Sequence, residues 1–66
     1  MSALVLEQVE DGMWELFFCG ELVGWIRKFK NDSRNMWIYQ VETPRGEIRH
    51  CYLLSQARNT LLELYA

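Results

Sequence analysis

The chain has 66 residues, of which half are hydrophobic and nine are aromatic, and its formal net charge is −2. This composition is typical of one small packed domain over residues 1–66 and excludes a disordered tail. No apolar run approaches the roughly 20 residues of a membrane span, and no basic segment precedes an apolar run as in a signal peptide. We therefore expect a cytoplasmic protein in which Cys19 and Cys51 are reduced thiols.

The charge is divided unevenly along the chain. Residues 1–26 contain five carboxylates and no Lys or Arg, which gives −5, whereas residues 27–66 contain seven basic and four acidic residues, which gives +3. Such a dipolar molecule can orient a charged partner through its field. The simpler interpretation is that loops and strand ends carry solvated charges.

Two strands are predicted at the N-terminus, at residues 3–9 and 13–19. Asp11-Gly12 between them is typical of a two-residue hairpin turn, which makes Glu10 face Met13. Counting from that turn divides the side chains between two faces. One face then holds Val5, Glu7 and Val9 with Trp14, Leu16 and Phe18; the other holds Leu4 and Leu6 with Phe17 and Cys19.

A third strand is predicted at residues 21–30, after a turn at Gly20. A two-residue turn places Val23, Trp25, Arg27 and Phe29 beside Trp14 and Leu16. A three-residue turn ending at Gly20 instead places Leu22, Gly24 and Ile26 there. One residue of register exchanges the two faces, and the sequence leaves both alternatives open.

After a polar loop at residues 31–35, residues 36–53 have the clearest hairpin pattern. Pro44 suits the first central position of a type I turn, and Gly46 suits the positive φ that follows it, so Thr43 faces Glu47. One face then holds Trp37, Tyr39 and Val41 with Arg49, Cys51 and Leu53. The other holds Met36, Ile38, Gln40 and Glu42 with Ile48, His50 and Tyr52.

A helix is predicted from Gln56 to Tyr65, with Ser55 as its N-cap. Its apolar stripe comprises Ala57, Leu61, Leu64 and Tyr65. The predicted fold is therefore α+β: a four- to five-stranded antiparallel meander, open or curled into a small barrel, with one C-terminal helix packed on it.

The strands are apolar on both faces, although one helix covers only one face. The sheet therefore either curls into a barrel, dimerises, or leaves an aromatic surface for a partner. We predict a small non-catalytic interaction module that associates with itself or with another protein through that surface. The predicted anchor residues are Trp25, Phe29, Met36, Ile38 and Tyr52.

Catalytic and metal motifs are not evident, so we expect no enzyme activity and no cofactor or small-molecule substrate. His50 and Cys51 are adjacent in a strand, and their side chains then point to opposite faces, so they do not pair as base and nucleophile. One His and two distant Cys do not supply the four ligands of a zinc site.

The alternative prediction is nucleic-acid binding, because basic residues alternate with aromatic ones around the third and fourth strands. The basic residues are Arg27, Lys28, Lys30, Arg34 and Arg49. Antiparallel strands followed by the tail HCYLLSQARNTLLELYA resemble in outline the arm-binding domain of phage tyrosine integrases, which implies DNA binding by the sheet. The acidic first strands argue against DNA binding, since neutralisation of the phosphates by basic residues supplies most of the non-specific affinity.

Overall fold

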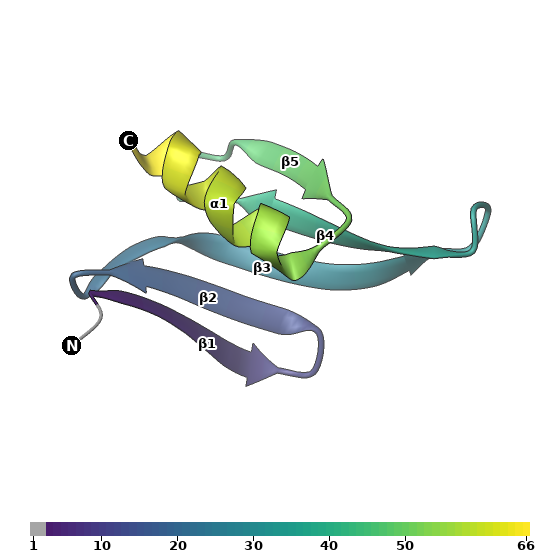
Figure 1. Cartoon of the computed structure of the whole chain (residues 1–66), viewed down its shortest axis with the longest axis horizontal. Coiled ribbons are helices and arrows are strands. Elements are labelled where there is room, and N and C mark those ends of the chain that lie inside the picture. Colours follow the sequence, from purple (N-terminus) through teal and green to yellow (C-terminus); the bar gives the residue numbers. More distant parts are fainter. Residues whose placement is uncertain (1–2) are drawn as a thin grey trace.

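Residues 3–66 are described by a computed structural model and form five strands followed by one helix. The elements are β1 (Leu4–Glu10), β2 (Met13–Phe18), β3 (Glu21–Asn31), β4 (Met36–Glu42), β5 (Ile48–Cys51) and α1 (Leu54–Tyr65). The strands pair antiparallel in chain order, and α1 lies across one face of the sheet (Figure 1). The predicted meander with a C-terminal helix is confirmed. The barrel alternative is wrong, because β1 and β5 stay at opposite edges.

The helix packs on β3, β4 and β5, and this side of the sheet is called the covered face. The opposite side is called the open face, because no other described element lies over it. Beyond Arg27 and Tyr39, β3 and β4 pair only with each other. This part, residues 28–38, is called the arm, and it projects past the helix in Figure 1.

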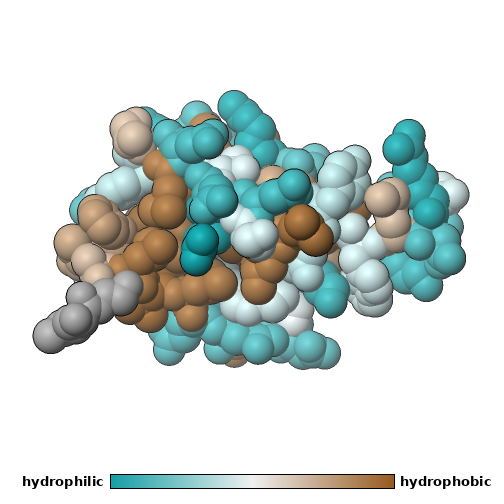
Figure 2. Space-filling model, viewed as in Figure 1, coloured by the Kyte–Doolittle hydropathy of each residue, from teal (hydrophilic) through white to brown (hydrophobic). Residues whose placement is uncertain are grey.

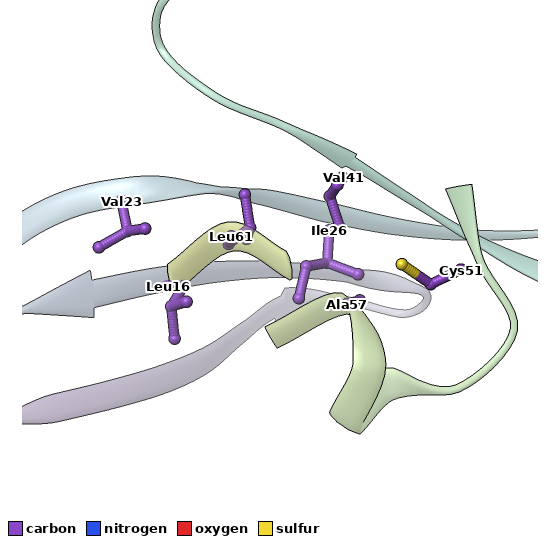
Figure 3. Close-up of a cluster of buried hydrophobic side chains, with 7 residues drawn as sticks. All are labelled: Leu16, Val23, Ile26, Val41, Cys51, Ala57 and Leu61. Atoms are coloured by element: carbon purple, nitrogen blue, oxygen red, sulfur yellow. The ribbon is translucent and has the colours of Figure 1, made fainter. Parts of the chain in front are cut away.

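The core lies between the covered face and α1 (Figure 3). Its buried side chains come from β2 to β5 and from the helix: Leu16, Val23, Ile26, Val41, Cys51, Ala57 and Leu61. Most are branched aliphatic residues, which suit a pleated surface and lose little rotamer freedom when buried. The core is small, so the remaining apolar side chains lie at its margin or on the surface.

The first hairpin turns at Asp11-Gly12, and Glu10 faces Met13 as predicted. The register then shifts by one residue between Gln8 and Glu10, so that Leu6 faces Leu16. The predicted assignment of faces in β1 is therefore wrong. Val5 and Val9 are 50% and 46% exposed, and Leu4 and Leu6 pack against the core instead. A bulge beside the turn explains the exchange, because one extra residue reverses every later side chain.

The second turn combines features of both predicted alternatives. Cys19 and Gly20 both have positive φ (52° and 81°), the pattern of a two-residue type I′ turn, and Phe18 faces Glu21. The register then shifts between Leu16 and Phe17, so Gly24 faces Leu16. The turn therefore has two residues, but Gly24 and Ile26 face Leu16 and Trp14 as the three-residue alternative predicted. Leu22 does not join them and faces Phe17.

The hairpin of β4 and β5 has the predicted register. Gly46 has φ 89°, its N–H donates to the Thr43 carbonyl oxygen at 2.9 Å, and the Thr43 N–H donates to the Glu47 carbonyl oxygen at 3.0 Å. Val41 then faces Arg49. The Pro-Arg-Gly turn therefore determines which residues of both strands lie under the helix.

The helix begins earlier than predicted, at Leu54, so Ser55 lies inside its first turn and is not the N-cap. Leu53 occupies the cap position and supplies no side-chain hydrogen bond. The Gln56 side chain instead accepts a hydrogen bond from the Tyr52 N–H at 3.3 Å, which ties the residue before the cap to the first turn. Of the predicted stripe, Ala57 and Leu61 are buried, whereas Tyr65 is 39% exposed.

Candidate interaction surface

Four of the five predicted anchor residues lie on the open face, and the polar pair of Arg27 and Gln40 separates Trp25 from the other three. Because Ile26 and Val41 are buried on the covered face, alternation places their neighbours on the other side. In the resulting ladder Phe29 faces Ile38, and Met36 follows on the same strand. Phe29 and Met36 are 37% and 36% exposed. Together with Trp25, these side chains form a set called the anchor surface: Trp25, Phe29, Met36 and Ile38.

Tyr52 is the fifth predicted anchor, and the sheet does not place it on this surface. It follows the end of β5, whose ladder stops at the pair of Tyr39 and Cys51. Its side chain is 55% exposed. The turn into α1 therefore removes Tyr52 from the strand alternation on which its prediction depended.

A shallow cavity surrounds Trp25 on the open face, with a volume of about 340 Å³. Glu15 faces Trp25 from β2 and Glu42 faces it from β4, so the indole lies between two carboxylates. The cavity is lined by Met13, Glu15, Trp25, Ile26, Arg27, Gln40 and Glu42. Of its lining residues, Trp25, Met13 and Arg27 are of types enriched at protein interfaces, whereas Glu15 and Glu42 are of a depleted type.

The carboxylates on the open face are poorly neutralised. Glu7 faces Glu15 directly in the β1–β2 ladder, and like charges in that position destabilise a sheet. The one ion pair found among residues 3–66 joins Arg45 and Glu47 at 2.8 Å, away from this row. The β1 side of the molecule is therefore acidic on the open face.

His50 lies on the open face, as the strand alternation predicts. Its ring contacts Phe29 edge-on, with centroids 6.4 Å apart, and its Nε2 is 3.3 Å from Gln40 Oε1. Cys51 is buried on the covered side, where its Sγ is 3.4 Å from Thr60 Oγ1. The two side chains therefore do not act together, and no group of potential metal ligands occurs in the described part of the chain.

The five predicted nucleic-acid contacts do not form one cluster. Arg27 faces Gln40 and lies on the open face, whereas Arg49 faces Val41 and lies on the covered side. Lys28 and Lys30 face Tyr39 and Trp37, also on the covered side, and Arg34 lies in the loop at the tip of the arm. The basic residues are therefore distributed over both faces of the sheet and the loop at the tip of the arm.

An aromatic cluster on the covered face was not predicted. Lys28 Nζ lies 4.7 Å from the ring centroid of Trp37 and 5.8 Å from that of Tyr39, and the Trp14 and Tyr39 centroids are 5.9 Å apart. Cation–π contact of this kind stabilises the half-buried lysine. The facing of Tyr39 and Trp37 could be read from the hairpin, but that of Lys28 depended on the unresolved third-strand register.

The end of α1 is tied to two turns of the sheet. Tyr65 donates its hydroxyl proton to Glu21 Oε2 at 2.7 Å, and this hydrogen bond is the main reason why the pKa of Tyr65 is raised. Arg45 donates to the Leu64 carbonyl oxygen at 2.7 Å. These contacts hold the helix over the covered face and leave the open face without a covering element.

Comparisons with known protein families, curated proteins and solved structures found no match. Within residues 3–66, no helix combines the length and the apolar character that crossing a membrane requires.

Proposed function

We propose that the chain is a non-catalytic protein-interaction module whose binding surface is the open face of its sheet. The observation that carries this proposal is the placement of Trp25, Phe29, Met36 and Ile38 on one face that α1 does not cover. Aromatic residues and Met are enriched at interface centres, where they supply most of the binding energy. The partner is a second copy of the chain or another protein.

The size of the molecule is compatible with this role. Its total accessible surface is 4638 Å², and a stable interface removes about 800 Å² from each partner, roughly one sixth of that area. A small domain also has a limited core of its own, so association adds stability that folding alone does not supply. The anchor surface is therefore both available and useful for binding.

Sedimentation velocity over a wide concentration range tests the proposal. We expect the wild-type chain to associate with itself, and we expect the double substitution Phe29→Ser with Ile38→Ser to shift it toward monomer. Because Phe29 is 37% exposed and Ile38 is half-buried, the substitutions also remove a cross-strand pair and should lower the thermal stability of the monomer modestly.

Trp37→Ser is the matched control. Trp37 is 52% exposed, more than Phe29, and it lies next to Ile38 on β4 but on the covered side of the sheet. The substitution Trp37→Ser should leave self-association unchanged if the open face is the interface. A wild-type chain that stays monomeric at every concentration argues against self-association. Equal effects of Trp37→Ser and the double substitution argue against the open face.

Nucleic-acid binding by the arm is a second candidate. Lys28, Lys30 and the exposed ring of Trp37 support it, because all three lie on the covered side of the arm. Arg34 adds a further positive charge at the tip of the arm. Positive charge beside aromatic rings is what single strands bind.

Titration with a single-stranded oligonucleotide at low and high salt tests this second candidate. Binding should fall steeply as salt rises, because each neutralised phosphate releases a counterion. Lys30→Gln with Arg34→Gln should reduce both the affinity and the salt dependence. Absence of binding at low salt would exclude this role.

A further inference from the structure

The two edges of the sheet differ in how they are protected. β5 has 4 residues, including Arg49 and His50, whereas β1 has 7 residues, LVLEQVE, with no proline and no basic residue. Long, regular and partly apolar edge strands are those that accept another strand, and proteins usually block them with lysine, proline or a cover. β1 lies at the free edge without lysine, proline or a cover. Its bulge between Gln8 and Glu10 lies beside the turn, and the register from Leu4 to Gln8 is regular.

The hydrogen bonds of the first hairpin show which backbone groups of β1 point outward. The Cys19 N–H donates to the Ala3 carbonyl oxygen at 2.8 Å, so the backbone groups of Ala3 point toward β2. In an antiparallel ladder the backbone groups of successive residues point alternately to either side, so those of Val5 and Glu7 also point toward β2. Leu6 and Gln8 consequently direct their N–H and C=O groups away from the sheet, where a further strand can pair with them.

The negative charge along this edge indicates which residues an added strand should carry. Glu7 lies between those two outward-pointing residues, and it already faces Glu15 across the ladder. A residue opposite Glu7 on an added antiparallel strand would occupy a non-hydrogen-bonded pair, in which side chains come closest. A lysine or arginine there would neutralise Glu7 and relieve its repulsion by Glu15.

The covered side of the same edge is apolar. Leu4 and Leu6 of β1 and Leu62 of α1 are partly buried at the margin of the core. Figure 2 shows hydrophobic surface gathered where α1 and the start of β1 lie, with hydrophilic surface over the arm. Side chains of an added strand that point to this side would therefore meet apolar neighbours.

We propose that β1 binds an extended segment of another polypeptide in which basic and apolar residues alternate. The basic side chains lie toward Glu7 on the open face, and the apolar ones lie toward Leu6 on the covered face. A second copy of β1 supplies no basic residue to Glu7. Pairing Leu6 with Gln8 sets Glu7 against Glu7, and pairing Leu6 with Leu6 sets Glu7 against Val5. This edge site is separate from the anchor surface.

A labelled, end-blocked peptide of alternating lysine and valine is a direct probe, measured by fluorescence anisotropy at low salt. Wild type should bind it, and an alternating glutamate–valine peptide should not bind. Gln8→Pro removes only an outward N–H, so the fold should tolerate it while binding weakens by about tenfold or more. Gln8→Ala keeps that N–H and is the matched control with unchanged affinity.

Glu7→Lys supplies a second test with two readouts of opposite sign. It turns the pair with Glu15 into an attractive one, so the midpoint of thermal unfolding should rise, while peptide affinity should fall by roughly tenfold. Failure of wild type to bind the basic peptide would overturn the proposal, as would equal binding by Gln8→Pro or Glu7→Lys. Self-association lost in Gln8→Pro would instead identify β1 as a self-pairing edge. None of these results depends on Phe29 and Ile38.

Discussion

Leu61 lies directly over Gly24, where α1 packs on β3. A methyl group on Gly24 would lie 2.6 Å from Leu61 Cδ2 and 2.5 Å from the carbonyl oxygen of Glu42. Gly24→Ala should therefore force the helix and β4 apart and lower the free energy of unfolding by about 1–3 kcal/mol. Denaturant unfolding measured by tryptophan fluorescence would show the loss.

A double-mutant cycle separates the two clashes of this position. Leu61→Ala alone removes a fully buried side chain and should cost about 2–5 kcal/mol. Combined with Gly24→Ala it should cost less than the sum, because the helix-side clash is gone while the clash with Glu42 remains. Additive costs, or a neutral Gly24→Ala, would show that the helix does not rest on this glycine.

The start of α1 provides a second prediction. Ser55→Ala should change the free energy of unfolding by less than about 0.5 kcal/mol, because Ser55 caps nothing. Leu53→Ser should stabilise the chain by about 0.5–1 kcal/mol, since Leu53 has the extended backbone of an N-cap (φ −132°, ψ 146°) and is 57% exposed. If Ser55→Ala instead lowers the free energy of unfolding by about 1 kcal/mol, Ser55 and not Leu53 is the N-cap.

Turn chemistry explains which parts of the fold were predictable. Pro44 and Gly46 specify a turn by their own backbone preferences, so the register of β4 and β5 and the facing of Ile38 followed from counting. Two bulges next to the first and second turns did not follow. A bulge exchanges faces at small local cost, and it forms here because Leu6 and Ile26 then lie on the side where the helix packs. That advantage is tertiary and leaves no local signal.

The same distinction applies to the candidate site. Met36 and Ile38 could be placed on one face from the hairpin alone, whereas Trp25 and Phe29 joined them only once the third-strand register was known. The ladder does not assign Tyr52 to a face, because β5 ends at Cys51 and the chain then turns into α1. Face assignments are therefore reliable near a well-specified turn and weaken with each bulge or strand end.

The turn of the last hairpin carries a third prediction. Thr43 is 4% exposed, and its Oγ1 accepts a hydrogen bond from the Glu47 N–H at 3.1 Å. Thr43→Val keeps the shape but leaves that N–H without its partner, so we expect a loss of about 1–3 kcal/mol in chemical denaturation. Thr43→Ser keeps the hydroxyl and should cost clearly less. If both substitutions cost the same, packing and not the hydrogen bond determines the effect.

The hydrogen bond from Tyr65 to Glu21 should make stability depend on alkaline pH. The neutral phenol donates to the carboxylate, so the pKa of Tyr65 is raised above its ordinary value of 10.0. This contribution is fully present below the unfolded-state pKa and is lost as pH rises through the folded-state pKa. The difference in unfolding midpoint between wild type and Tyr65→Phe should therefore shrink in strongly alkaline buffer, and Glu21→Gln should move the phenolate titration back toward the ordinary value. A pH-independent difference would show that the hydroxyl does not stabilise the fold.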